Sequence, residues 1–268
     1  MSMQPQLIPS KSEHGYVAPD YLEATARLVA PIKAQTYAQM RLQAGQRVLD
    51  VGCGVGIDVI ALAQWVGSGG QALGADADAE MVQQARAKIA EAKVTHAGVE
   101  CASAEDLPWA NASFDSVRCE RMFQHLAQPE DALAEMLRVT RPGGRVVVLD
   151  TDWGSMSINA PNSALERRLV AFKPEQALRN GFVARRLPAL MQTAGLKDVQ
   201  IAVLPVYSTH YRTARFACAL DDLTARALQA GIATRQEILD FERTLATLDT
   251  AGCFFASVNM VLVAGTKA

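Results

Sequence analysis

The architecture of this chain follows from Arg47-Val48-Leu49-Asp50-Val51-Gly52-Cys53-Gly54-Val55-Gly56. Its short apolar run stops abruptly at glycines, which is typical of a buried parallel strand. Residues 57–66 follow with apolar side chains at helical spacing, so we predict a strand, a glycine turn and a helix. The glycines allow positive φ and close approach of a ligand, and the N–H groups at the start of the helix point into the same crevice.

The spacing of this turn indicates the kind of ligand. Dinucleotide enzymes use Gly-x-Gly-x-x-Gly, whereas this turn reads Asp-x-Gly-x-Gly-x-Gly. Asp50 at the strand end would repel a pyrophosphate but suits a ligand with a cationic amino-acid part. The segment from Asp50 to Gly56 resembles the first motif of the class I S-adenosylmethionine-dependent methyltransferases. A nicotinamide dehydrogenase is an alternative that the glycine spacing disfavours.

Composition excludes several other classes. The chain has 268 residues, half of them hydrophobic, and 26 basic against 28 acidic residues give a net charge of −2. We therefore expect one globular domain, and no basic surplus points to a nucleic-acid partner. No apolar run is long enough to span a bilayer, and Met1 to Ser12 lack the apolar core of a signal peptide, so we expect a cytoplasmic protein without a membrane partner.

Cysteines and histidines give no metal signature. The five cysteines are widely spaced without a Cys-x-x-Cys pair, and the four histidines are scattered. The cysteines are interpreted as reduced thiols, and no metal is expected.

Three segments downstream strengthen the resemblance. Gly74-Ala75-Asp76-Ala77-Asp78 reads as a second strand ending in an acid, followed by a helix that Asp78 caps. The resemblance implies that Asp76 binds the ribose of the cofactor and that Ser103-Ala104-Glu105 lies at the adenine. The turn 141–145 and the valine strand 146–150 complete the match. In all, the resemblance implies that S-adenosyl-L-methionine, with S-adenosyl-L-homocysteine as product, contacts Asp50, Gly52, Cys53, Gly54, Gly56, Asp76, Ala77, Met81, Ser103, Ala104, Glu105 and Glu120.

The predicted fourth strand, 114–121, ends in two opposite charges. In the resemblance this strand end faces the sulfonium, so Glu120 is a candidate base or anchor and Arg121 a candidate ligand for an acidic substrate group. A structural ion pair between Glu120 and Arg121 is the alternative. His125 is a third catalytic candidate, with packing beside the cofactor as its alternative.

The implied fold is an α/β, Rossmann-like seven-stranded sheet, mostly parallel with an antiparallel last strand and helices on both faces. We divide a single domain, 1–268, into an N-terminal helical cap (1–42), a cofactor-binding core (43–150), helical lid insertions (151–185 and 212–252) and a closing strand (253–268). Pro31 should kink the helix of the cap or split it in two. The resemblance places the seventh strand between the fifth and the sixth.

The lid and cap supply candidate substrate residues: Tyr16, Tyr21, Trp153, Tyr207 and Phe254. For each of these residues ordinary packing is the alternative. We expect a methyltransferase that acts on a small-molecule acceptor, of the secondary-metabolite or quinone-like type, by in-line transfer to O, N or C. The alternatives are a protein or RNA methyltransferase and a cofactor-binding protein without catalysis; a homodimer is left open.

Overall fold

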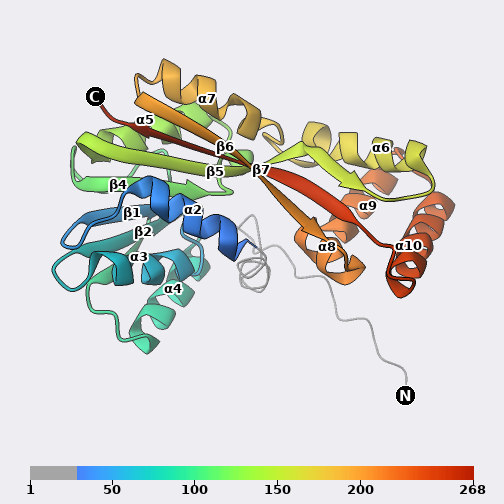
Figure 1. The fold of residues 1–268 in the computed structure, drawn as a ribbon, viewed down its shortest axis with the longest axis horizontal. Helices are drawn as coiled ribbons and strands as arrows, with labels where there is room; N and C mark the ends of the chain where they lie inside the picture. Colours follow the sequence, from blue (N-terminus) through green and yellow to red (C-terminus); the bar gives the residue numbers. More distant parts are fainter. Residues whose placement is uncertain (1–28) are drawn as a thin grey trace.

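The computed structural model describes residues 29–268, which form a seven-stranded sheet in the order β3-β2-β1-β4-β5-β7-β6 (Figure 1). Strands β1, β2, β3, β4 and β5 are parallel, and β7 runs antiparallel to both β5 and β6. The predicted mixed sheet, with the last strand between the fifth and the sixth, is confirmed. The strands are β1 (Arg47–Val51), β2 (Gln71–Asp76), β3 (Ala97–Cys101), β4 (Phe114–Glu120), β5 (Thr140–Ile158), β6 (Lys197–Ser208) and β7 (Ala256–Thr266).

Helices cover both faces of the sheet. One apolar core joins the sheet to α5 (Pro129–Val139) and α7 (Val183–Thr193). A second core, on the opposite face, joins it to α2 (Ala30–Met40), α3 (Ile57–Val66) and α4 (Ala79–Glu91). Successive strand residues point to opposite faces, so Leu49 and Val51 lie in the first core while Val48 lies in the second.

Local sequence accounts for the helix starts around the glycine turn. The Asp78 carboxylate accepts a hydrogen bond from the Glu80 N–H and caps α4, as predicted. Pro31 lies in the first turn of α2, where its missing N–H costs nothing, so the described helix begins beside this proline. The rest of the predicted N-terminal cap lies outside the described residues.

Beyond the parallel sheet the chain builds a second lobe (Figure 1). β5, β6 and β7 extend into it, and it contains α6 (Ser163–Phe172), the π-helical turn η2 (Lys173–Ala177), α8 (Tyr211–Ala217), α9 (Leu220–Gln229) and α10 (Arg235–Thr250). This lobe has its own apolar core. A Thr234–Glu237 capping box starts α10.

Three predicted boundaries need correction. Residues 151–158 continue β5 and pair with β7 on both sides of a register shift between Asp152 and Ser157, so the first insertion begins after Ile158. Residues 141–145 form a register shift inside β5 instead of a separate turn. Phe254 precedes β7, which starts at Ala256. Within residues 29–268, no helix combines the length and apolar character needed to cross a membrane.

Candidate active site

The glycine turn lies at the carboxyl end of β1 and has the predicted backbone. Gly52, Gly54 and Gly56 have φ of 72°, 51° and 78°. A Cβ on Gly52 would lie 2.9 Å from Met122 Sδ, and one on Gly56 would lie 2.9 Å from Ala85 Cβ. Both positions therefore require glycine for two reasons: the backbone is left-handed, and there is no space for a Cβ atom.

Cys53 and Asp76 fix this turn against the end of β2. The N–H groups of Gly52 and Cys53 donate to the Ala75 carbonyl at 2.8 and 3.0 Å. The Cys53 thiol is buried and packs beside Gly74, where any larger residue would collide with it. Cys53 therefore packs the glycine turn against β2.

Asp76 has the geometry of a hydroxyl acceptor. Its Oδ2 accepts from the Gly54 N–H at 2.8 Å and its Oδ1 from the Asp78 N–H at 3.0 Å. Burial raises the pKa of Asp76, and these two N–H donors act against that rise. Since each carboxylate oxygen has two acceptor directions, Asp76 can accept two further hydrogen bonds at the strand end.

The other predicted cofactor residues follow β2 and β3 along the same edge of the sheet. Met81 is buried on α4, and Ala77 is exposed in the turn before it. The Ser103 hydroxyl accepts from the Glu105 N–H at 3.2 Å, and both side chains are exposed around the buried Ala104. Parallel strands bring these three segments together at one edge.

A buried charge cluster lies beneath the turn, and it was not anticipated from the sequence. Arg118, fully buried on β4, points at three carboxylates: its Nη1 lies 3.2 Å from Asp50 Oδ1 and 3.3 Å from Asp58 Oδ1, and its Nη2 lies 2.7 Å from Glu120 Oε2. Helix α2 contributes Lys33 and Tyr37, which both bond to Asp58. Lys33 Nζ is also 3.6 Å from Glu120 Oε2.

The pKa values of the two aspartates in this cluster shift in opposite directions. Burial raises the pKa of Asp50, because the Arg118 charge that pairs with it is shared with two other carboxylates and Lys33 lowers this pKa less than Arg118 does. Burial would also raise the pKa of Asp58, but the Arg118 and Lys33 charges outweigh it and lower that pKa. Asp50 is therefore the carboxylate with the least compensated charge, and it lies at the start of the glycine turn, where a cationic ligand group would stabilise it.

Glu120 and Arg121 form the ion pair that was the alternative to catalysis, with Arg121 Nε 3.3 Å from Glu120 Oε1. That oxygen is buried and accepts no hydrogen bond among the described residues. Arg118 and Lys33 hold the other oxygen, Oε2. Glu120 is therefore better placed to bind a ligand group than to act as a base that removes a proton. Arg121 has a φ of 53°, a left-handed conformation that costs energy for a side chain with a Cβ and recurs at functional sites.

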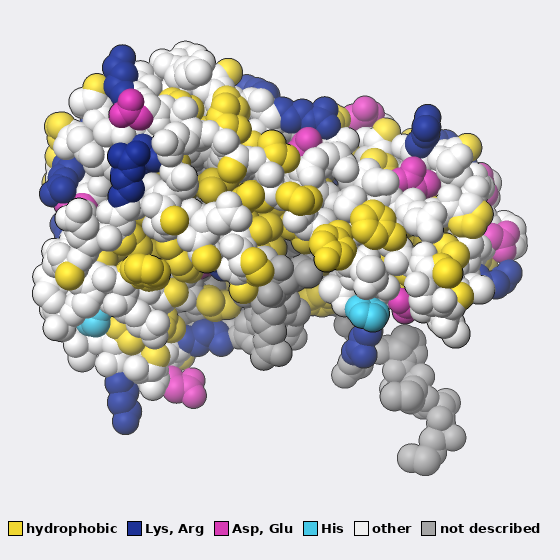
Figure 2. Space-filling model, in the orientation of Figure 1, with side chains coloured by type: hydrophobic (Ala, Val, Ile, Leu, Met, Phe, Trp, Pro, Cys, Tyr) yellow, Lys and Arg dark blue, Asp and Glu magenta, His cyan; other side chains and the backbone are white. Residues whose placement is uncertain are grey.

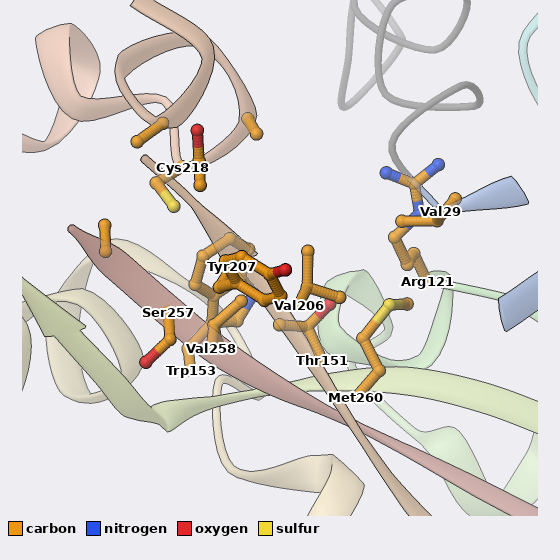
Figure 3. A pocket seen from close by; sticks show the side chains of 14 residues that line it. Val29, Arg121, Thr151, Trp153, Val206, Tyr207, Cys218, Ser257, Val258 and Met260 are labelled. Carbon is orange, nitrogen blue, oxygen red and sulfur yellow. The ribbon is translucent and has the colours of Figure 1, made fainter. Parts of the chain in front are cut away.

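A pocket opens beside Arg121, with an empty volume of about 550 Å³ that includes its open mouth. It lies between the ends of β5, β6 and β7 and the start of the second lobe (Figure 3). Figure 3 shows Arg121 and Val29 on one side and Tyr207 and Trp153 on the other. The fourteen lining residues are Val29, Arg121, Thr151, Trp153, Val206, Tyr207, Ser208, Ala214, Ala217, Cys218, Ala256, Ser257, Val258 and Met260.

The substrate candidates therefore separate into three groups. Trp153 and Tyr207 line the pocket as predicted. Phe254 does not, because it is buried in the core of the second lobe with its ring centroid 5.6 Å from that of Tyr211. Tyr16 and Tyr21 lie outside the described residues. His125 ends the short 3₁₀ helix η1 (Phe123–His125), half-buried, and is absent from the pocket lining.

Comparisons with known proteins identify the family. Residues 49–148 match the family profile described as a methyltransferase domain. An uncharacterised 37.1 kDa protein of transposon TN4556 from Streptomyces fradiae is 35% identical over 253 residues, which cover 91% of this chain and 71% of that protein. The chain belongs to the class I S-adenosylmethionine-dependent methyltransferases. Its cofactor is S-adenosyl-L-methionine.

A further relative and a solved structure show how far the similarity extends. A demethylmenaquinone methyltransferase of Halalkalibacterium halodurans is 36% identical to this methyltransferase over 119 residues. That match covers 44% of this chain and 49% of the relative, so it spans about half of that protein's length. The YcgJ protein of Bacillus subtilis has the same fold, with a TM-score of 0.60 at 22% identity over 91% of this chain and 98% of its own.

The residues of this methyltransferase fit its cofactor. The glycine turn gives a backbone cradle in which Cβ atoms would collide, and Asp76 offers acceptor oxygens beside it. Asp50, whose charge Arg118 compensates only in part, suits the cationic amino-acid part, and the buried Glu120 Oε1 lies 3.3 Å from Nε of Arg121, which lines the pocket. We infer that the crevice and the pocket meet at Glu120 and Arg121.

Proposed function

We propose that this protein transfers a methyl group to a small, mostly apolar acceptor that binds in the pocket beside Arg121. The observation that carries the proposal is the lining of that pocket: most of its fourteen residues are apolar, and one wall is a Trp153 ring. Such a concave, apolar lining with a few polar groups is typical of small-molecule sites. The relative named a demethylmenaquinone methyltransferase supports a quinone-like acceptor.

The bound cofactor supplies an electrophilic methyl on a sulfonium. The acceptor's O, N or C forms the new bond to that methyl as the bond to sulfur breaks, and the sulfonium charge disappears. The protein's contribution is alignment and exclusion of water. Trp153 is held in place for this task, because its indole N–H donates to Gln124 Oε1, whose own N–H₂ donates to the Arg121 carbonyl.

The catalytic residues are assigned as part of the same proposal. Arg121 holds the acceptor, Glu120 orients Arg121 and faces the cofactor, and His125 stays a candidate base for acceptors that must lose a proton. A protein or RNA substrate fits less well, since Arg121 is the one charged side chain in the described lining and the pocket is lined mainly by small apolar groups.

Filling the pocket tests this function. Ala217 lies in the lining, at the end of α8, while Thr213 is exposed on the same helix and outside the lining. With methyl-labelled S-adenosylmethionine and a panel of phenols, quinols and aromatic acids, we expect transfer by the wild type and by Thr213→Phe. Ala217→Phe should lose at least about tenfold in kcat/KM, about 1.4 kcal/mol, while binding S-adenosylhomocysteine normally. Wild-type transfer by Ala217→Phe would remove the pocket from the reaction.

A further inference from the structure

The described lining of the pocket carries a single charged side chain, Arg121, which pairs with Glu120 outside that lining. No carboxylate is present among the fourteen described lining residues. The Arg121 Nε lies 3.3 Å from Glu120 Oε1, and an arginine guanidinium has five N–H donors, so it can pair with more than one group at a time. A planar fork of this kind matches the geometry of an oxyanion.

A second cation lies behind the opposite wall. Lys173, in the π-helical turn η2, is buried with its Nζ 4.0 Å from the centroid of the Trp153 ring, and it donates a hydrogen bond to the Cys218 carbonyl. Trp153 and Cys218 both line the pocket. Single π-helical turns recur at functional sites.

The charge of Lys173 has no close counter-ion among the described residues. No described carboxylate lies within ion-pair distance of its Nζ; Asp222 and Arg226 of α9, of opposite sign, act on it from further away. Burial accordingly lowers the pKa of Lys173 to about 8. An unpaired buried ammonium is expensive, and an anion in the neighbouring pocket would offset that cost.

The same contact argues against a cationic acceptor. Amine and ammonium ligands are held over aromatic faces, and Trp153 is the largest aromatic wall of this pocket. One face of that ring already carries the Lys173 ammonium, so a second cation on the other side would be repelled. A neutral acceptor would leave both cations as they are, whereas an anion would be attracted by both.

We propose that the acceptor binds as an anion: an apolar molecule with a carboxylate, an acidic phenol or an enol, whose ionised oxygen pairs with Arg121 while Lys173 acts through the Trp153 wall. This inference rests on the proposed function and names its substrate class. If the ionised oxygen is itself methylated, its lone pair forms the bond to the methyl as the carbon–sulfur bond breaks. The negative charge and the sulfonium charge then vanish together, and no base is required.

Three probes of one shape test the charge preference: cinnamate, cinnamamide and cinnamylamine, which are anionic, neutral and cationic. Each is titrated by calorimetry into the full-length protein saturated with S-adenosylhomocysteine. We expect cinnamate to bind about tenfold more tightly than cinnamamide, and cinnamylamine to bind most weakly. Equal binding of the three probes, or a preference for the amide or the amine, would overturn the inference.

Substitutions test which residues cause the preference for cinnamate. Arg121→Gln should abolish the preference for cinnamate, Arg121→Lys should keep part of it, and Lys173→Met should reduce it several-fold without changing cinnamamide binding. Arg212→Gln, which removes an exposed arginine of α8 outside the lining, should bind like the wild type. A preference that survives Arg121→Gln would refute the role of Arg121.

Prior titration with S-adenosylhomocysteine separates the two proposals. Wild-type protein that binds no S-adenosylhomocysteine would contradict the proposed function itself. Protein that binds S-adenosylhomocysteine yet prefers cinnamamide would contradict the anionic acceptor alone. Loss of S-adenosylhomocysteine binding in Arg121→Gln would show that Arg121 serves the cofactor, and the inference would fail at that residue.

Discussion

Replacing Lys173 with methionine should change how the stability of the fold depends on pH. The Lys173 side chain is buried against Trp153, and the ionisable or charged groups that act on it are the Cys218 thiol, Asp222 and Arg226. Burial lowers its pKa from the ordinary 10.5 to about 8. The methionine side chain is similar in length and carries no charge, so Lys173→Met removes this titration while largely keeping the packing.

The sign follows from where the proton is held. Between about pH 8 and pH 10.5 the unfolded chain keeps the lysine proton that the folded chain has lost, so the free energy of unfolding rises with pH across that window. Below about pH 8 the penalty for burying the ammonium is fully present. At about 1.4 kcal/mol per pKa unit the whole window is worth about 3.5 kcal/mol, of which about 2.5 kcal/mol falls between pH 7 and pH 10.

Urea unfolding of the wild type and Lys173→Met at several pH values from 7 to 10 measures this difference. The wild type should gain about 2.5 kcal/mol relative to the variant over that range, because the titrations of groups that do not interact with Lys173 cancel between the two proteins. Lys197→Met, which replaces an exposed lysine on β6, serves as the control and should follow the wild type. If the Lys173→Met and wild-type curves stay parallel within about 0.5 kcal/mol, Lys173 is not a buried, uncompensated cation.

Three further substitutions address the cofactor crevice. Asp76→Ala should weaken S-adenosylhomocysteine binding by about 1.5–3 kcal/mol, since a charged acceptor is lost; unchanged affinity in calorimetry would remove Asp76 from the site. Gly52→Ala should destabilise the fold by about 1–2 kcal/mol in urea unfolding, because its φ is 72° and its Cβ would meet Met122 Sδ at 2.9 Å; wild-type stability would mean that the turn relaxes freely. Glu120→Gln should lower turnover with little effect on S-adenosylhomocysteine affinity, and should cost about 1.5–3 kcal/mol of stability through its bond to Arg118. A normal rate in that variant would leave Glu120 a structural role only.

Much of the fold follows from local signals in the sequence. The glycine turn, the Asp78 cap and the apolar strands depend on residues close together in the chain, so each could be predicted from spacing and residue type. The position of β7 between β5 and β6 came from the family resemblance. The extension of β5 to Ile158 was missed, because it pairs with a strand about a hundred residues later and has no local pattern.

The buried charge cluster as a whole could not be predicted from the sequence, although one of its residues gave a signal that was overlooked. Asp50, Asp58, Arg118 and Lys33 come from four different elements, and no local pattern predicts that they meet. Arg118 itself was a visible warning, since an arginine within a strand that is covered on both faces needs carboxylate partners. The prediction that Phe254 lines the substrate pocket was wrong. An aromatic residue near an insertion packs in a core more often than in a pocket, and Phe254 packs in the core of the second lobe.

The possible homodimer and the predicted contacts of the site residues, those to adenine included, stay predictions. The edge strand β6 exposes Ile201, Val203 and Tyr207, and Figure 2 shows hydrophobic side chains gathered across the middle of this face of the molecule. Phe255, at the start of β7, stacks on Tyr207 with ring centroids 6.1 Å apart. Sedimentation of the full-length protein would determine whether this face pairs with a second copy.

The central claim is that the cofactor crevice and the apolar pocket form one active site that meets at Glu120 and Arg121. A crystal structure of the full-length protein with S-adenosylhomocysteine tests it most directly. The account predicts a ribose bonded to Asp76, an amino-acid part beside Asp50, and a sulfur atom that faces the pocket near Arg121. A sulfur atom that points away from the pocket, or a ligand bound elsewhere in the protein, would contradict it.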